Sequence, residues 1–345
     1  MTVPSQQPNE RFGGDFIGLL ATDIRQAEQR MKTAPRARGF FRSRSTNACI
    51  TDAKNMKTPE KLYKSLVFEK ELTILCADTG IGKSIFAVQI AEDIARTGRT
   101  VLYLDLELSD KQFEGRYSDN YTNHYVFSDN LIRADFDPNN YTVPDGVTYE
   151  DYFIESLVGL IGDWGATVVI IDNMTALIST DTDSAKTAKP LMDRLNQLKK
   201  ELGITILVLE HTRKTDFGRP ISLNDMQGSK MKGNFADAAF TIGRSAKDKN
   251  LRYVKQLKCR SAEVEYDADN VLLYEVAKDS NFLSFKPLGF STEYEQLQQP
   301  SDDDKTARIE KAKALKTQGL SQRAIAKELG VSEGAVRKWL KVASA

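Results

Sequence analysis

The chain has 345 residues, of which 41% are hydrophobic and 28% are charged. This composition is typical of globular proteins and excludes a wholly disordered or collagen-like chain. The net charge is zero, but residues 1–58 carry ten basic and five acidic side chains, and residues 305–345 carry ten and three. The middle is left with 28 basic and 40 acidic residues. We expect any bound nucleic acid to be held partly by the basic ends, unless these are only solvated tails.

The chain has three widely spaced cysteines, Cys49, Cys76 and Cys259. Their odd number and wide separation argue against a disulfide framework and indicate a reducing compartment. No run approaches about 18 consecutive apolar residues, and the polar start has no signal-peptide pattern. We therefore expect a soluble, cytoplasmic protein without a membrane partner.

The expected elements begin with an amphipathic helix over 16–31 and a basic stretch at 35–45 that has no clear period. From residue 72 onward, short apolar runs alternate with helical segments. The runs lack in/out alternation, as parallel strands covered on both faces do, so they predict a doubly wound, mainly parallel α/β sheet. The expected strands are 72–77, 100–107, 167–172, 204–210, 238–243, 251–257 and 271–276, and the expected helices between them include 83–97 and 190–202.

The pattern divides the chain into four segments. Residues 1–58 form the N-terminal helix and basic segment, and 59–280 form the α/β domain. Residues 281–304, which end in QQPSDDD, are expected to be a linker, and 305–345 a small all-helical domain.

The sequence ADTGIGKS at 77–84 fits the Walker A pattern, with Ala in place of the first Gly. An expected strand precedes it and an expected helix follows, which is the context that the motif requires. Gly80 and Gly82 let the backbone curl so that its N–H groups face one anion. Lys83 then reaches the β- and γ-phosphates of ATP, and Ser84 ligates Mg²⁺. The predicted nucleotide contacts are Asp78, Thr79, Gly80, Ile81, Gly82, Lys83, Ser84 and Ile85.

The run VVIID ends in Asp172, which is the Walker B candidate. A carboxylate at this strand end can hold Mg²⁺ directly or through water. The alternative is an aspartate that caps the following helix.

Residues 62–84 and 101–116 resemble the RecA-like core of hexameric replicative helicases, of the DnaB and plasmid RepA types. The second segment matches the family's Leu-Glu…Gln…Arg element at Leu106, Glu107, Gln112 and Arg116. The resemblance implies that Glu107 is the general base that polarises the attacking water. A carboxylate at the end of the strand beside the phosphate loop is suited to this role. The alternative is a surface glutamate that begins a loop.

Two further motifs carry the resemblance. In ILVLEHTRK, His211 occupies the position where the family has a Gln or His that senses the γ-phosphate, although a lone histidine is often structural. VKQLKCR ends in Lys258 and Arg260, which match the family's Lys-x-Arg pair. The resemblance implies that Arg260 reaches the neighbouring subunit's nucleotide as an arginine finger. Outside a ring, the pair is only the solvent face of an edge strand.

Residues 219–229 resemble the DnaB-type loop that faces the central pore. For a threaded single strand, phosphate contacts would come from the basic residues in and around this loop, unless it is an ordinary solvated loop. These are Arg213, Lys214, Arg219, Lys230 and Lys232.

The chain also departs from the family pattern. We expect no counterpart of the N-terminal helical domain of the DnaB type in residues 1–58, so the resemblance does not imply docking of a primase through that domain. The insert at 117–150 has no counterpart, and its acidic character argues against DNA contact. The helix at 16–31 either packs on a neighbouring subunit, as a linker helix does in this family, or folds back on its own core.

The last segment contains QRAIAKELGVSEGAVRKWLK at 322–341, which predicts a helix-turn-helix. Ser321 and Ser332 are expected N-caps, and a helix over 307–318 would complete a three-helix core. The pattern resembles resolvase-like and regulator-like units. Its second helix would face the major groove with Glu333, Arg337 and Lys338. The alternative is a helical pair that contacts protein.

Together these features predict an ATP-hydrolysing, RecA-like homo-oligomer, expected to be a hexameric ring, that binds DNA. The favoured function is that of a replicative DNA helicase of a plasmid or mobile element, with a single strand in its pore and duplex on its helix-turn-helix. One alternative is a regulatory or targeting ATPase that assembles on duplex DNA without unwinding it. Another is a DNA-binding regulator whose nucleotide mainly stabilises an oligomer.

Overall fold

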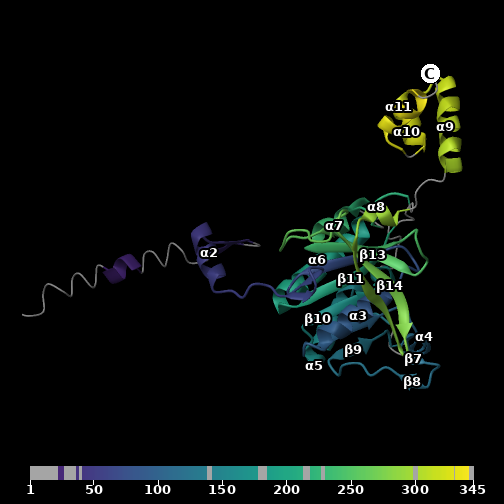
Figure 1. Cartoon of the computed structure of the whole chain (residues 1–345). Helices are drawn as coiled ribbons and strands as arrows, with labels where there is room; N and C mark the ends of the chain where they lie inside the picture. Colours follow the sequence, from purple (N-terminus) through teal and green to yellow (C-terminus); the bar gives the residue numbers. More distant parts are fainter. Residues whose placement is uncertain are drawn as a thin grey trace, which may run out of the picture. The chain divides into compact units, whose positions relative to one another are not determined.

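The computed structural model describes residues 22–26, 36–38, 41–137, 142–177, 185–212, 218–226, 230–297, 302–329 and 331–341. The chain divides into two units, Met1–Thr58 and Pro59–Ala345 (Figure 1). Among the described residues, no helix is long and apolar enough to cross a membrane.

The first unit contains β1 (Arg36–Arg38), β2 (Phe41–Ser43) and α2 (Thr46–Lys54). The sheet of the second unit is built from β5 (Leu72–Ala77), β6 (Val101–Asp105), β9 (Leu131–Ala134), β10 (Val168–Asp172), β11 (Thr205–His211), β12 (Ala238–Arg244), β13 (Leu251–Lys258), β14 (Val271–Asp279) and β15 (Phe282–Ser291). Two short hairpins accompany it, β3 (Lys61–Tyr63) with β4 (Val67–Phe68), and β7 (Ser118–Asp119) with β8 (Asn123–His124).

The helices of the second unit are α3 (Lys83–Ala95), α4 (Asp110–Arg116), α5 (Tyr149–Trp164), α6 (Ala185–Leu202), α7 (Lys230–Phe235), α8 (Glu293–Gln296), α9 (Asp302–Thr317), α10 (Gln322–Leu329) and α11 (Glu333–Lys341). Two 3-10 turns, η1 (Met174–Leu177) and η2 (Leu223–Asp225), lie between them in the chain.

In the first unit, the basic stretch forms an antiparallel hairpin of β1 and β2, where the sequence predicted no regular element. Helix α2 follows, and its N-cap Ser45 accepts a hydrogen bond from the Ala48 amide at 3.2 Å. Of the helix expected over 16–31, residues 22–26 are described and are helical. The rest of that helix lies outside the described residues.

The nine-stranded sheet has the order β15-β14-β13-β12-β5-β11-β10-β6-β9. The strands from β12 to β9 are parallel, and β13, β14 and β15 continue the sheet antiparallel. This architecture confirms the predicted mainly parallel α/β sheet. The central parallel strands β5, β6 and β10 are buried along their whole length, as strands covered on both faces are.

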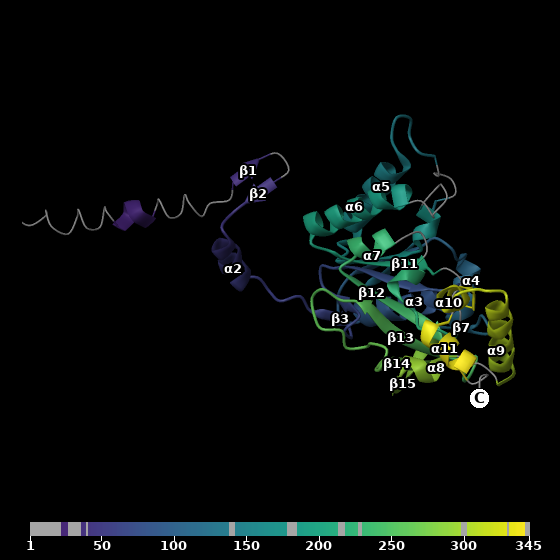
Figure 2. The same ribbon diagram turned by 90° about the horizontal axis from the view of Figure 1, so that it is seen from above.

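Each face of the sheet has its own core. Residues that alternate along one strand face opposite ways, so Leu75 packs with Phe86 of α3, whereas Ile74 packs with Leu157 of α5 and Leu195 of α6. The flanking helices can be followed in Figure 2. The doubly wound arrangement brings the carboxyl ends of the parallel strands to one edge, where ligands bind in such sheets.

The expected linker at 281–304 is wrong for most of its length. Residues 282–291 form the edge strand β15, which pairs with β14, and 293–296 form α8. Asp279 pairs with Phe282 across a two-residue turn in which Ser280 has a φ of 53°. Pro287 and Gly289 hide this strand in the sequence, and an edge strand tolerates both because one of its sides is unpaired.

The C-terminal helices α9, α10 and α11 form a separate small core around Ala312, Ile325 and Val336. The Ser321 and Ser332 side chains each accept a backbone hydrogen bond at 3.2 Å, from Ala324 and Ala335. The start of α9 at residue 302 is five residues earlier than expected.

Candidate active site

The phosphate loop joins β5 to α3. Gly80 and Gly82 have φ values of 72° and 110°, a conformation that side-chain-bearing residues rarely adopt. Gly82 is the N-cap of α3 and has no side chain to cap the helix, so the first N–H groups of α3 remain available to an anion. A Cβ at Gly82 would lie 3.1 Å from the Phe285 ring. The loop therefore has the backbone that phosphate binding requires.

Lys83, the first residue of α3, is buried. Its Nζ donates hydrogen bonds to the carbonyls of Ala77 (3.0 Å) and Asp78 (3.2 Å) and to Nδ1 of His211 (3.0 Å). Burial lowers the pKa of Lys83, and the nearby carboxylate of Asp172 partly offsets this effect. The ammonium group thus lies inside the phosphate loop and in contact with the end of β11.

Strand register brings the predicted residues to this edge. The last residue of β11, His211, pairs with Ala77 at the end of β5, and Asp172 of β10 pairs with Asp105 of β6. Because the four strands are parallel and adjacent, their ends converge on the phosphate loop.

Asp172 is almost fully buried, and the Tyr103 hydroxyl donates a hydrogen bond to its Oδ2 at 2.7 Å. Its Oδ1 is also buried and receives no hydrogen bond within the described part of the chain. Burial raises the pKa of Asp172 to about 6, against the lowering effect of the Ser84 and Tyr103 hydroxyls. An unsatisfied carboxylate oxygen beside Ser84 fits a Mg²⁺ ion, a hard cation with oxygen ligands.

The raised pKa predicts a pH dependence of Mg²⁺ binding. Below about pH 6 Asp172 gains a proton and loses the charge that attracts the cation. The apparent Mg²⁺ affinity in the presence of ATP should therefore fall by up to about tenfold per pH unit below that value. A Mg²⁺ titration of ATP hydrolysis from pH 5 to 8 measures this fall. Asp172→Asn should bind Mg²⁺ weakly at every pH, and an inflection near pH 6 that persists in this variant would contradict the assignment.

A turn between β6 and α4 presents Glu107, whose side chain is 45% exposed. Asp105 builds this turn by accepting hydrogen bonds from the Leu108 amide (2.9 Å) and the Glu107 amide (3.3 Å). Arg133 of β9 donates to Asp105 Oδ2 (3.0 Å) and to the Leu108 carbonyl (2.6 Å). The insert whose role the sequence left open therefore supplies the strand and the arginine that order the Glu107 turn.

Asn173, which sequence analysis did not single out, connects the predicted base to the predicted sensor. It is buried, its Nδ2 donates a hydrogen bond to Oε1 of Glu107, and the same atom lies 3.3 Å from Nε2 of His211. Its only signal in the sequence is its place directly after the Walker B strand.

The two ring nitrogens of His211 have different neighbours. Nδ1 lies 3.0 Å from Lys83 Nζ, and on the opposite side of the ring is Nε2. That nitrogen is on the side of Glu107, whose Oε1 lies 3.9 Å away. His211 therefore touches the phosphate loop with one nitrogen and faces the predicted base with the other. This placement suits a γ-phosphate sensor, and the role itself stays a prediction.

Replacing Asn173 tests whether its hydrogen bond positions Glu107. Asn173→Ala should lower kcat by roughly 10–100-fold and leave the Kd for ATP nearly unchanged, because Glu107 loses the side chain that orients it. Asn196→Ala, in α6, is a matched control at a distance from the cluster. Steady-state hydrolysis and equilibrium ATP binding separate the two effects, and a kcat within twofold of the wild type would contradict the positioning role.

Lys258 and Arg260 lie elsewhere. Lys258 pairs with Ala239 at the start of β12. Lys258 and Arg260 are therefore at the end of the sheet opposite the phosphate loop. Lys258 Nζ donates to the carbonyls of Gly233 (2.8 Å) and Ala236 (2.7 Å), while Arg260 forms an ion pair with Asp237 at 3.3 Å. The pair therefore does not reach the nucleotide site of its own chain.

Only some of the other predicted residues have side chains that the structure describes. Gln112 forms a capping box with Ser109 at the start of α4, and Arg219 forms an ion pair with Asp225. Arg213 and Lys214 lie outside the described residues, as do the side chains of Lys230 and Lys232 on α7. On α11 three predicted DNA contacts are exposed: Glu333, Arg337 and Lys338.

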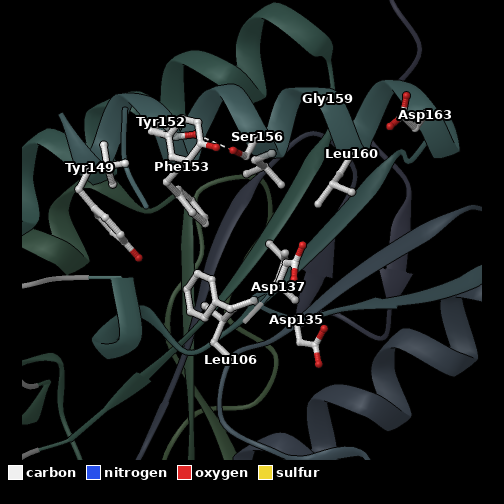
Figure 3. A pocket seen from close by; sticks show the side chains of 14 residues that line it. Leu106, Asp135, Asp137, Tyr149, Tyr152, Phe153, Ser156, Gly159, Leu160 and Asp163 are labelled. Atoms are coloured by element: carbon white, nitrogen blue, oxygen red, sulfur yellow. Dashed lines mark hydrogen bonds between the residues drawn. The ribbon is translucent and has the colours of Figure 1, made fainter. Parts of the chain in front are cut away.

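A cavity of about 410 Å³ lies between α5 and the segment that follows β9. Figure 3 shows side chains of α5 on one side of it, with Leu106 and Asp137 facing them. Lys83, Asp172 and His211 do not line this cavity, so it is not the nucleotide site.

Comparison with known proteins finds family models for two parts of the chain. The family model of an AAA domain matches residues 45–216, and that of a homeodomain-like domain matches residues 302–341. Among solved structures, a KaiC-like protein from the hyperthermophilic archaeon Pyrococcus horikoshii OT3 matches 67% of this chain and 98% of its own, with 16% identity and a TM-score of 0.46. The chain carries a P-loop ATPase domain and a C-terminal homeodomain-like helix-turn-helix. Its assignment to the DnaB or RepA type stays a prediction.

Proposed function

We propose that this chain, with its P-loop ATPase domain and helix-turn-helix, is an ATP-driven DNA motor, a ring-forming replicative helicase of a plasmid or mobile element. The observation that carries the proposal is the cluster at the sheet edge, in which Lys83, His211, Asn173 and Glu107 follow one another in contact. A protein that merely senses a nucleotide does not need a carboxylate in contact with the groups that meet its phosphates.

The chemistry divides among these side chains. The phosphate loop and Lys83 hold the polyphosphate, and Ser84 and Asp172 hold Mg²⁺, which when bound offsets phosphate charge. Glu107 accepts the proton of the attacking water. His211 contacts the phosphate loop and faces Glu107, so loss of the γ-phosphate changes the hydrogen bonds of His211. Because His211 is the last residue of β11, this change can move the segment that follows the strand.

The position of Arg260 supports a ring. The Arg260 side chain is 54% exposed at the end of the sheet opposite its own phosphate loop. A head-to-tail assembly places that end of one subunit against the nucleotide edge of the next, and such contacts form a ring when the rotation between subunits closes. Arg260 then completes the neighbour's site.

The C-terminal domain supplies duplex binding. Its helices have their own core and caps, and Arg337 and Lys338 are exposed on the second helix of the pair, which enters the major groove in such units. This feature also favours a second candidate, a targeting ATPase that assembles on duplex DNA without unwinding it.

Strand separation on a forked DNA substrate tests the proposal. The wild-type chain with ATP and Mg²⁺ should release the labelled strand, and Lys83→Ala should not. The Arg337→Ala/Lys338→Ala variant should lose duplex binding, by roughly tenfold or more for two charged contacts, and still unwind a preformed fork. A wild-type chain that hydrolyses ATP and binds duplex but never separates the fork would favour the targeting ATPase.

A further inference from the structure

An arginine from the antiparallel part of the sheet reaches the phosphate loop. Arg252, the second residue of β13, is 7% exposed. Its Nε donates a hydrogen bond to the carbonyl of Ile81 at 2.9 Å. Its Nη1 donates to the carbonyl of Lys249 (2.7 Å), in the turn before β13, and to that of Leu251 (2.8 Å), the first residue of β13. One guanidinium thus connects the β12–β13 turn to the centre of the Walker A motif.

No carboxylate balances this charge within the described residues. Arg252 has no ion pair there, and its cross-strand partner on β12 is another cation, Arg244. Burial lowers the pKa of Arg252, and the like charge of Arg244 lowers it further. A buried cation is normally paired with an anion, because removing it from water is costly. The surroundings of Arg252 therefore favour an anionic ligand beside it.

The bond to Ile81 also controls the direction of a phosphate-facing donor. The peptide between Ile81 and Gly82 is planar, so the Ile81 carbonyl and the Gly82 N–H point in opposite directions. Gly80 and Gly82, on either side of Ile81, have positive φ values, and glycine leaves the backbone free to adopt other conformations. A fixed carbonyl at Ile81 consequently fixes the direction of the Gly82 N–H.

We propose that Arg252 is a positioning residue of the nucleotide site: it holds the Ile81 carbonyl outward, turns the Gly82 N–H toward the phosphates, and has its charge offset by the bound polyphosphate. The proposal rests on the nucleotide site of the proposed function and deepens it. It does not depend on DNA binding, on unwinding or on a ring.

Equilibrium binding of Mg–ADP and of adenosine to the full-length chain tests the role. Arg252→Gln should weaken ADP binding by roughly 10–100-fold, the loss of a charged hydrogen-bonding group, and leave adenosine binding unchanged. Arg252→Lys keeps a charged donor and should lose only a few-fold. Arg244→Gln removes the same charge from the neighbouring strand without touching Ile81, and should change ADP affinity less than Arg252→Gln does.

Three results would overturn the proposal. They are an ADP affinity of Arg252→Gln within twofold of the wild type, equal losses in Arg252→Gln and Arg244→Gln, and equal losses for ADP and adenosine. If Arg252→Gln fails to fold by circular dichroism, Arg252→Lys decides, and an unchanged ADP affinity in that variant overturns the proposal. A failure of the DNA motor itself would instead appear as normal ADP binding without unwinding.

Discussion

Glu107→Gln should abolish most ATP turnover and leave ATP binding intact. General base catalysis contributes about 10²–10⁴-fold in rate, and a glutamine has the same shape but accepts no proton from water. The Asn173 amide donates to Oε1 of Glu107, an atom that glutamine retains, so the cluster should keep its arrangement. Lys83 and the phosphate loop do not depend on this carboxylate for their hydrogen bonds.

Steady-state hydrolysis and equilibrium ATP binding, measured on the same preparations, test this prediction. Glu155→Gln changes an exposed glutamate of α5 in the same way and should behave as the wild type. Turnover by Glu107→Gln within tenfold of the wild type would show that another group accepts the proton. Loss of ATP binding would instead show that Glu107 holds the nucleotide.

Arg260→Ala should lower kcat by about 10³-fold or more, the effect of removing an arginine finger. Arg260 lies at the end of the sheet opposite the phosphate loop of its own chain, so the ATP affinity of the Arg260→Ala variant should change little. Arg260→Ala retains an intact phosphate loop, and Lys83→Ala retains an intact finger. In equal mixture, about a quarter of the interfaces of a randomly mixed head-to-tail ring join the two intact halves.

The recovered rate in this mixture should therefore approach a quarter of the wild-type rate per site if the sites act independently. Arg194→Ala, which removes an arginine on α6 paired with Asp151, is the control for loss of a surface charge. If mixing restores nothing at any ratio, Arg260 does not act across an interface. Its ion pair with Asp237 would then be its main role.

Local motifs in the sequence predict where several of the candidate site residues lie in the fold. The Walker A spacing located the phosphate loop, and the apolar runs located Asp172 and His211 at strand ends, because parallel strands end at one edge. The structure adds that Lys83 contacts His211 and that the Asn173 side chain lies between His211 and Glu107. The roles predicted for Glu107 and Arg260 remain for the experiments above.

Other features depend on contacts that no local pattern reveals. Asn173 and Arg252 are ordinary residues in the sequence, and each matters through a partner far along the chain, Glu107 or Ile81. The strand β15 was missed because Pro287 interrupts its pattern, and an edge strand needs no continuous apolar run. The insert could not be assigned because the function of Arg133 is visible only once β9 lies beside β6.

The most direct test of a DNA motor is the steady-state ATPase rate of the pure protein, measured at moderate salt without DNA, with single-stranded DNA and with duplex DNA. A motor that engages one strand should be stimulated several-fold by single strands and less by duplex of equal length. Stimulation by duplex alone, or by neither DNA, would contradict the helicase and favour the targeting or regulatory ATPase.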